Sequence, residues 1–563
     1  MKAPWLGSFT GNVRWDANLP QISIASLVDS AAAQWPSHCA LDYMGRRVSY
    51  RELASMVDRA AAGLTGLGVG PGVHVGLFLP NVPQYVIAFF AILKAGGTVV
   101  NYSPLDADEV LSHKVEDSET RILITLDQAS LYPKMAKLLG KGGLETLVVG
   151  SLGEYGASPD QIQARLVQDS LVSPVEYDAQ CLHFADLLKP PVAAAELPVP
   201  IDPDTVAVLQ YTGGTTGLPK GAMLTHANLA AATGQCVLTN VDNDKLLGHG
   251  KERFLAVLPL FHIYALVCDM LFPLSIGAEI VLAVRFDPGA VLRDIAQRRI
   301  TCFPGVPTMF TALVSHPDVA SHDLHSLKVC CSGGAPLPVE LLNRFAELTG
   351  CHLSEAWGMT ETAACGTFTP LWGQRKAGSC GIPQPGVRIK FLDVDNPSRE
   401  VPMGERGEIA IAGPNVMAGY WKGLKATQDS FTADGYFRTG DVGHMDADGY
   451  LYIVDRTKDM LLCGGFNVYP RVLEEAIYTH PAVEEVLVIG VPDAYRGESP
   501  KAYIKLRAGQ DPFPIDALKD FLRDKLGKHE MVQAMEFRAD LPKTAVGKLS
   551  KKMLKDELAA AGA

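Results

Sequence analysis

The chain has 563 residues, of which 47% are hydrophobic, 20% charged and 8% aromatic. This length allows several structural units with a large core, and the composition excludes disordered, collagen-like and coiled-coil chains. The 62 acidic residues outnumber the 50 basic ones, and the net charge of −12 disfavours nucleic acid as a partner.

Cysteine usage and apolar runs predict a cytoplasmic protein without a membrane span. The 11 cysteines include no Cys-x-x-Cys pair, so we expect reduced thiols and neither a disulfide framework nor a cysteine-ligated zinc ion. Residues 1–15 have no apolar core of signal-peptide length. The densest apolar run, residues 86–93, is shorter than the roughly 20 residues that cross a bilayer. Polar residues, proline and glycine interrupt residues 263–284, which predicts two buried core elements there.

The first third of the chain alternates helix-like and strand-like segments. Residues 26–35 and 50–67 have helical patterns, and an apolar run follows at 74–79. Further apolar runs occupy residues 98–102, 121–125 and 146–150. This alternation predicts helices that cover a largely parallel sheet.

In the rest of the chain, the pattern of apolar runs and turn residues changes at two points. The proline-rich residues 189–200 predict a surface connection. Short apolar strands at 206–209, 254–258, 280–284 and 328–331 end in glycine- or proline-bearing loops, where ligands of such sheets bind. After residue 387, Asp434-Gly435 and Asp448-Gly449 indicate antiparallel hairpins. A smaller α+β unit is expected from about Asp455.

Residues 211–221, YTGGTTGLPKG, predict a phosphate-binding loop between a strand and a helix-like segment near His226. Glycines let backbone N–H groups approach anionic oxygens, threonine hydroxyls add donors, and Lys220 adds a positive charge. A plain flexible turn is the alternative. The loop is not a Walker A loop, because Gly221 follows Lys220, and the chain has no G-x-G-x-x-G, G-x-S-x-G or H-E-x-x-H pattern.

This loop resembles the signature loop of the acyl-adenylate-forming enzymes, the superfamily of acyl-CoA synthetases, peptide-synthetase adenylation domains and beetle luciferases. Further resemblances follow in the family's order: an adenine-side loop at 332–336, a phosphate and magnesium motif at 357–362, a ribose motif at 436–441, a hinge at 455–459, a thiol-channel loop at 464–470 and a catalytic-lysine motif at 542–548. Seven motifs in fixed order are a specific signal.

The resemblance implies the fold. Residues 1–455 are expected to form a large N-terminal region of α/β sheets plus a distorted β-barrel, which binds ATP and the acyl substrate. Residues 456–563 are expected to form a small mobile α+β domain that carries the catalytic lysine. Periodicity alone supports only a mixed α/β fold.

The resemblance also implies catalytic roles. Lys548 would stabilise the charge that grows on the α-phosphate, and Glu361 with Thr215 would hold Mg²⁺. His262 would orient the substrate carboxylate, although a histidine satisfied within the core is an equal alternative. Trp357 either packs in the core or flanks adenine and the acyl pocket, and relatives often have tyrosine there.

The remaining contacts follow from the same motifs. Asp441 would accept the ribose hydroxyls, Arg456 would hold ribose and phosphate oxygens, and Lys458 would sit at the hinge. Taken alone, Asp441 and Arg456 are equally typical of a turn and a solvated face. The full predicted set for nucleotide and CoA is Thr212, Gly213, Gly214, Thr215, Thr216, Gly217, Lys220, Gly333, Gly334, Ala335, Pro336, Trp357, Gly358, Met359, Thr360, Asp441, Arg456, Lys458, Gly464 and Gly465. Lys551, Lys552 and Lys555 would either meet CoA phosphates or form a solvated basic helix.

The predicted function is an AMP-forming ligase that joins a medium- or long-chain fatty acid to coenzyme A, with ATP and Mg²⁺. The run Tyr211-Thr-Gly-Gly, with glycine where many relatives have serine, and residues 465–470 resemble the long-chain synthetases. A dicarboxylic acid stays open. Alternatives are a ligase that loads a carrier protein, a luciferase-type oxygenase and a silent binding protein, the last disfavoured by the presence of Glu361, Asp441, Arg456 and Lys548. A homodimer and transient contact with a membrane surface also stay open.

Overall fold

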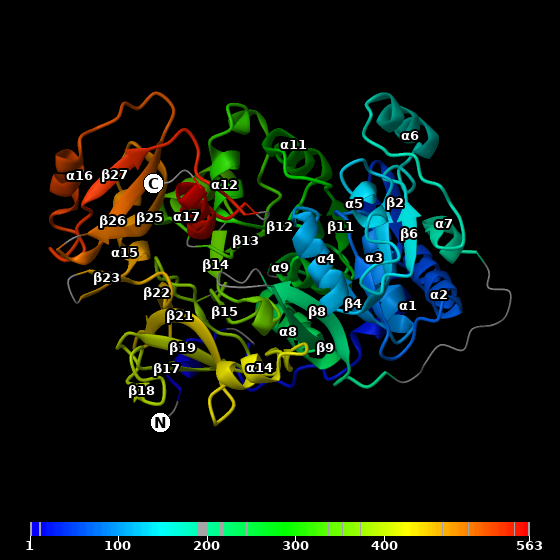
Figure 1. The fold of residues 1–563 in the computed structure, drawn as a ribbon, viewed down its shortest axis with the longest axis horizontal. Coiled ribbons are helices and arrows are strands. Elements are labelled where there is room, and N and C mark those ends of the chain that lie inside the picture. Colours follow the sequence, from blue (N-terminus) through cyan, green and yellow to red (C-terminus); the bar gives the residue numbers. More distant parts are fainter. Residues whose placement is uncertain are drawn as a thin grey trace.

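The computed structural model describes residues 3–10, 13–189, 201–212, 219–242, 246–335, 337–351, 353–371, 373–463, 466–493, 495–544 and 547–560. Helices and strands alternate through a large N-terminal region, and a small α+β domain follows it (Figure 1). The expected mixed α/β fold is confirmed. The division after residue 455 stays a prediction.

One sheet has the strand order β20-β9-β8-β4-β3-β5-β6-β7 and is parallel from β8 to β7. Its strands are β3 (His74–Leu77), β4 (Thr98–Asn101), β5 (Thr120–Leu126), β6 (Thr146–Gly150), β7 (Cys181–His183), β8 (Val206–Thr212), β9 (Lys220–Thr225) and β20 (Gly419–Tyr420). The helices within this stretch of chain are α3 (Pro83–Lys94), α4 (Asp108–Asp117), α5 (Tyr132–Ala136), α6 (Pro159–Gln168) and α7 (Phe184–Leu187). Residues 83–93 of α3 are all buried, which explains why this helix is apolar on every face.

A second sheet has the order β14-β13-β12-β10-β11-β1-β2 and is parallel except for the β1–β2 pair. Its strands are β1 (Cys39–Tyr43), β2 (Arg46–Ser49), β10 (Arg253–Ala256), β11 (Glu279–Leu282), β12 (Cys302–Gly305), β13 (Val329–Gly333) and β14 (Leu353–Ala356). The α-helices of these segments are α1 (Leu27–Gln34), α2 (Tyr50–Gly66), α8 (His226–Asn240), α11 (Pro288–Arg298), α12 (Pro307–Val314) and α13 (Val339–Thr349). Short 3-10 turns are η1 (Pro4–Gly7), η2 (Ile24–Ser26), η4 (Val319–Ser321) and η5 (Thr360–Thr362). The parallel, helix-covered arrangement expected from the alternating pattern is confirmed.

The apolar residues 263–284 form two buried elements, as expected. A helical segment, α9 (Ile263–Ala265), the π-helix η3 (Leu266–Leu271) and α10 (Phe272–Ser275), precedes the buried strand β11. Among the described residues, no helix combines the length and the apolar character needed to cross a membrane.

The glycine-rich segment differs from the expectation at both ends. β8 continues to Thr212 and pairs antiparallel with β9, which begins at Lys220, so Thr212 lies opposite Lys220. The segment therefore connects two strands, and α8 follows only after β9. Residues 221, 222, 224 and 225 are buried, so this strand lies within the sheet, which the glycine pattern concealed.

An antiparallel sheet follows, in the order β18-β17-β19-β21-β22, with the β15–β16 pair as a separate small sheet. The elements are β15 (Thr367–Phe368), β16 (Ile382–Pro383), β17 (Arg388–Leu392), β18 (Glu400–Val401), β19 (Gly407–Ala412), α14 (Leu424–Ser430), β21 (Phe437–Met445) and β22 (Leu451–Arg456). The predicted hairpin at Asp448-Gly449 joins β21 to β22, and the turn at Asp434-Gly435 brings Phe431 opposite Phe437.

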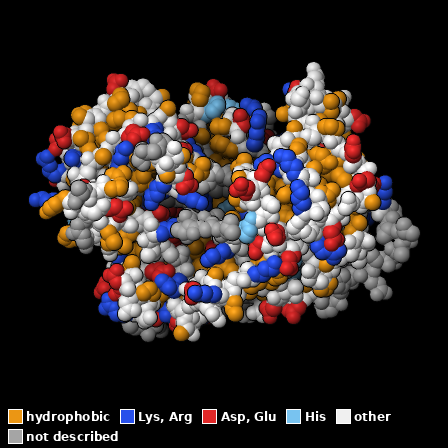
Figure 2. All heavy atoms as spheres, viewed as in Figure 1, with side chains coloured by type: hydrophobic (Ala, Val, Ile, Leu, Met, Phe, Trp, Pro, Cys, Tyr) orange, Lys and Arg blue, Asp and Glu red, His pale blue; other side chains and the backbone are white. Residues whose placement is uncertain are grey.

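The C-terminal domain has the strand order β24-β23-β26-β25, with β27 beside β26. Its elements are β23 (Leu461–Cys463), β24 (Phe466–Val468), α15 (Pro470–Tyr478), β25 (Val483–Asp493), β26 (Gly497–Leu506), α16 (Ile515–Leu522), β27 (Ala534–Phe537) and α17 (Lys551–Ala560). Its apolar cores, centred on residues 461–532 and 487–554, are separate from the large N-terminal core. Figure 2 shows this face of the molecule hollowed between the C-terminal domain and the N-terminal region.

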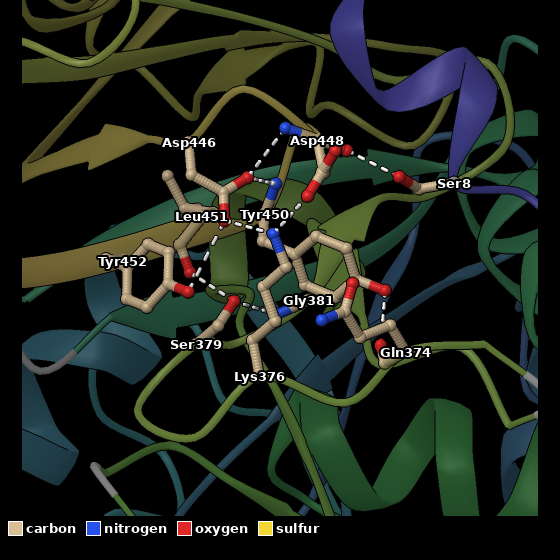
Figure 3. A network of polar contacts seen from close by, with 10 residues as sticks. All are labelled: Ser8, Gln374, Lys376, Ser379, Gly381, Asp446, Asp448, Tyr450, Leu451 and Tyr452. Carbon is tan, nitrogen blue, oxygen red and sulfur yellow. Dashed lines mark hydrogen bonds and ion pairs between the residues drawn. The ribbon is translucent and has the colours of Figure 1, made fainter.

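A polar network fixes the turn between β21 and β22 (Figure 3). Lys376 Nζ lies 2.6 Å from Asp446 Oδ2 and 2.6 Å from Asp448 Oδ2, and 4.7 Å from the centre of the Tyr450 ring. Ser8 Oγ donates to the carbonyl oxygen of Asp448 at 2.6 Å. One lysine thus joins two carboxylates of the turn, and the N-terminal segment docks on the same turn.

We predict that Lys376→Met lowers the free energy of unfolding by about 1–2 kcal/mol, because two carboxylates lose their common partner. Chemical denaturation of the full chain would measure this. Lys189→Met is the matched control, since Lys189 and its partner Asp186 are both exposed, and it should change the free energy by under about 0.5 kcal/mol. Equal effects of the two substitutions would contradict the prediction.

Candidate active site

The ends of parallel strands bring two predicted motifs together. Gly333, at the end of β13, lies beside Ala356, at the end of β14. The loop after β13 begins at Gly334, and the segment after β14 runs through Trp357 to Glu361. Because carboxyl ends of neighbouring parallel strands meet at one edge of the sheet, these segments line the same edge.

Lys548 reaches this edge from the C-terminal domain. Thr308 Oγ1, on α12, donates to the carbonyl oxygen of Gly547 at 2.7 Å and holds the lysine loop against the N-terminal region. The Lys548 side chain lies on Gly334, where a Cβ atom would be 2.1 Å from Cε and 2.3 Å from Nζ. A Cβ atom at position 334 would therefore displace the ammonium group from this position.

The charges around Lys548 tune its protonation. Desolvation, together with the nearby Arg456 guanidinium, lowers the pKa of Lys548 to about 8, and Asp441 partly offsets this. The pKa of an ordinary lysine is near 10.4, so Lys548 loses its proton at a lower pH than most lysines do.

Asp441 and Arg456 face each other across the β21–β22 pair. Arg456 Nε donates to Asp441 Oδ1 at 2.8 Å, and this charge raises the pKa of Arg456. Trp357 Nε1 donates to the other carboxylate oxygen, Oδ2, also at 2.8 Å. Glu408, on β19, accepts from the backbone N–H of Gly440 at 3.3 Å, next to Asp441. The predicted ribose motif is therefore an ordered carboxylate with two donors.

Glu361 lies in η5 and is buried, and desolvation raises the pKa of its carboxyl group. The Tyr420 hydroxyl donates to Glu361 Oε1 at 2.8 Å, and Lys220 Nζ lies 5.1 Å from the centre of the Tyr420 ring. Tyr420 is a site residue that the sequence did not reveal. A buried carboxylate is a hard oxygen ligand whose desolvation a divalent cation would offset, so Glu361 fits the predicted Mg²⁺.

His262 precedes α9, and its Nδ1 accepts from the backbone N–H of Tyr264 at 3.3 Å. Desolvation and the Lys548 charge lower the pKa of His262 to about 3, so the imidazole is neutral at physiological pH. With Nδ1 accepting, the neutral ring carries its proton on Nε2. His262 is therefore a neutral donor and not a cation. Tyr264 packs on Gly333 and donates to the carbonyl oxygen of Cys331 at 2.9 Å.

The hinge segment is tied to both parts of the chain. Buried Asp455 accepts from the backbone N–H groups of Arg456 and Arg471, each at 2.8 Å. Lys551 Nζ lies 3.2 Å from Glu474 Oε1, and its side chain is largely buried, so this lysine is an internal ion-pair partner here and does not belong to a solvated face. Its contact with CoA phosphates stays a prediction.

Ion pairs also cross between the C-terminal domain and the N-terminal region. Arg471, on α15, lies 4.0 Å from Glu355 at the end of β14, and Arg507 lies 3.7 Å from Glu340. Desolvation raises the pKa of Glu355 to about 7, and the Arg471 charge opposes this shift. These contacts hold the arrangement in which Lys548 reaches Gly334.

The other predicted residues divide into two groups. Thr212 ends β8 and Lys220 begins β9. Ala335 and Met359 lie in the two loops, Thr360 begins η5, and Lys458 follows β22. A Cβ on Gly358 would be 1.8 Å from the Ala364 carbonyl oxygen. Gly213, Gly214, Thr215, Thr216, Gly217, Pro336, Gly464 and Gly465 lie outside the described residues.

The family described as AMP-binding enzyme matches residues 28–421, and the AMP-binding enzyme C-terminal domain matches residues 472–548. The chain belongs to the AMP-binding enzyme family. A long-chain-fatty-acid–CoA ligase of Bacillus subtilis is 37% identical over 559 residues, 98% of each chain. A feruloyl-CoA synthase of Amycolatopsis is 37% identical over 519 residues, 92% of this chain and 95% of its own.

Solved structures agree with this family. The chain superposes on ATP-bound MatB from Rhodopseudomonas palustris with a TM-score of 0.81 and 29% identity, covering 95% of this chain and 99% of that one. The anthranilate CoA ligase AuaEII, solved with anthranoyl-AMP, gives a TM-score of 0.83 at 27% identity, over 96% of this chain and 99% of that one. This AMP-binding enzyme is an AMP-forming acyl-CoA synthetase.

We predict that Gly334→Ala slows formation of the acyl-adenylate about 10- to 100-fold, because the new methyl group displaces the Lys548 ammonium. Single-turnover assays would measure each half-reaction separately. Transfer from preformed acyl-AMP should slow less, because it does not need Lys548 at this position.

The matched control is Gly435→Ala. Gly435 has a φ of +83°, close to the +79° of Gly334, but nothing lies within 4 Å of a Cβ atom there. Its rate of adenylation should stay within about twofold of the unmodified enzyme. Equal losses at both glycines would show that backbone strain, and not contact with Lys548, causes the effect.

Proposed function

We propose that this enzyme activates a medium- or long-chain fatty acid as acyl-AMP and transfers the acyl group to coenzyme A, releasing AMP and pyrophosphate. The observation that carries the proposal is the Lys548 side chain on Gly334, near the charged pair Asp441 and Arg456. A cation beside an ordered ribose-type carboxylate suits attack on the α-phosphate of ATP.

In the first half-reaction, an oxygen of the substrate carboxylate attacks the α-phosphorus, and the bond to pyrophosphate breaks with its electron pair. Asp441 accepts the ribose hydroxyls, and Arg456 holds ribose and phosphate oxygens. The ammonium of Lys548 stabilises the negative charge that grows on the α-phosphate oxygens. Neutral His262 donates to the acid without adding a competing positive charge.

Glu361, with Thr215, would hold Mg²⁺, which supplies charge neutralisation for the phosphates when bound. Thr360 and Thr215 would donate to phosphate oxygens. Tyr420 keeps the Glu361 carboxylate oriented.

In the second half-reaction, the thiolate of coenzyme A attacks the acyl carbon, and AMP leaves with the electron pair of the anhydride bond. Lys548 must withdraw, and we propose that the domain after residue 455 rotates about Lys458 and brings Gly464 and Gly465 to the thiol. The Asp455 carboxylate accepts from the backbone N–H of Arg471 in the C-terminal domain, so this hydrogen bond has to break if Asp455 stays with the N-terminal region during the rotation.

The identity of the acid rests on the relatives. Fatty-acid ligases match over nearly the whole chain, which favours an aliphatic acid, while the feruloyl-CoA synthase makes an aromatic acid the second candidate. A dicarboxylic acid would need a partner for its distal charge, because an unpaired buried carboxylate is costly.

The test is thioester formation with a panel from acetate to stearate, the matching dicarboxylates and ferulate. Each acid is offered with coenzyme A and, in parallel, with a phosphopantetheinylated carrier protein. We expect kcat/KM for laurate or longer acids to exceed that for acetate by at least about 100-fold, a difference that burial of only three or four of the additional methylenes would supply at roughly 0.8 kcal/mol each. A preference for ferulate, or transfer to the carrier protein alone, would refute the proposal.

We predict that kcat/KM for ATP falls as the pH rises above about 8, because the Lys548 ammonium loses its proton there. Lys548→Arg should move this alkaline limb beyond the pH range in which the enzyme is stable. Lys548→Ala should slow adenylation at least about 100-fold and remove the limb. An alkaline limb that persists in both variants would assign the titration to another group.

A further inference from the structure

Trp357 contacts the carboxylate that we propose binds ribose. Its indole Nε1 donates to Asp441 Oδ2 at 2.8 Å, and both side chains are buried. The second oxygen, Oδ1, accepts from Arg456 Nε at 2.8 Å. A carboxylate oxygen can accept two hydrogen bonds, so each oxygen keeps one acceptor position for a ribose hydroxyl.

The surrounding chain fixes the direction of the indole N–H. The carbonyl oxygen of Trp357 accepts from the backbone N–H groups of Gly366 at 2.9 Å and Thr367 at 2.8 Å. The ring packs on Gly366, where a Cβ atom would be 2.7 Å from Cε3. The indole is thus held at its backbone and along its edge.

The two donors to Asp441 differ in exposure. Arg456 keeps 43% of its side chain accessible, whereas Trp357 is 8% accessible. The backbone of Asp441 is fixed within β21, so the freedom that remains is rotation of its carboxylate group. A buried donor restricts that rotation more firmly than a long, half-exposed side chain does.

We propose that Trp357 is a positioning residue, which orients the Asp441 carboxylate so that both oxygens face the ribose hydroxyls of ATP. This role is separate from flanking adenine. The inference rests on the proposed binding of ribose by Asp441, and it makes the indole N–H responsible for part of the preference for ribonucleotides over deoxyribonucleotides.

The test compares ATP with 2′-deoxy-ATP and 3′-deoxy-ATP in acyl-CoA formation by the full chain. The readout is the ratio of kcat/KM for ATP to that for each analogue. Trp357→Phe keeps an aromatic ring but removes the donor, and we expect the ratio to fall about tenfold, mainly through a higher KM for ATP. The penalty should be smaller with each analogue, because each lacks one of the two ribose hydroxyls that donate to Asp441.

Trp15→Phe is the matched control, because Trp15 Nε1 donates to the Val387 carbonyl oxygen at 2.8 Å, so this variant loses a comparable indole bond. Its ratio should equal that of the unmodified enzyme. If Trp357→Phe does not fold, Trp357→Met fills the space without a donor and should lower the ratio in the same way.

An unchanged ratio in a folded Trp357 variant overturns the inference, since a ring that only flanks adenine would penalise ATP and its deoxy analogues equally. That outcome differs from failure of the proposed function, in which the unmodified enzyme would form no acyl-CoA from any nucleotide.

Discussion

The whole arrangement depends on one placement, the ammonium of Lys548 against the bare backbone of Gly334. The lysine belongs to the C-terminal domain and the glycine to the N-terminal region. The positive charge is desolvated and lies near another cation, Arg456, both of which lower the pKa of the lysine. Such an ammonium is unfavourable in the free enzyme and most favourable when negative charge develops beside it, which is the condition for selective stabilisation of a transition state.

Contacts around the hinge make this placement specific yet reversible. The Thr308–Gly547 hydrogen bond and the ion pair of Arg471 with Glu355 hold the C-terminal domain in this position. Both are polar contacts. The main apolar cores of the two parts are separate, and one small apolar cluster, in which Val442 and Val454 pack with Tyr469, joins the two parts next to the hinge. Polar contacts between parts with separate cores can be exchanged at modest cost, so the same domain can present a different surface in the second half-reaction.

Local sequence patterns predicted the fold class and the order of the motifs. Parallel strands were predictable because apolar runs alternated with helical periods, and the turn at Asp448-Gly449 because Asp-Gly pairs suit tight hairpins. Lys548, Glu361 and Asp441 could be named from the sequence because each stands within a motif that resembles the family's, and their roles stay predictions.

Contacts between distant segments could not be predicted from those patterns. The bonds from Tyr420 to Glu361 and from Trp357 to Asp441 join residues of segments that are far apart in the sequence, and neither residue type signals its partner. The charge of Lys551 suggested contact with a ligand or with solvent. Its ion-pair partner, Glu474, lies on α15, and both α15 and α17 pack against β25. The sequence predicted a glycine-rich loop over residues 211–221, but Thr212 and Lys220 pair within the sheet. That pairing depends on strand register, which the glycine pattern does not indicate.

The central claim is that this site forms an acyl–AMP anhydride before any thiol takes part. Exchange of labelled pyrophosphate into ATP, measured without coenzyme A, tests this most directly. The account predicts exchange that requires a fatty acid and is nearly abolished in Lys548→Ala. Exchange that is independent of acid, or its absence with every acid in the presence of normal thioester formation, would contradict it.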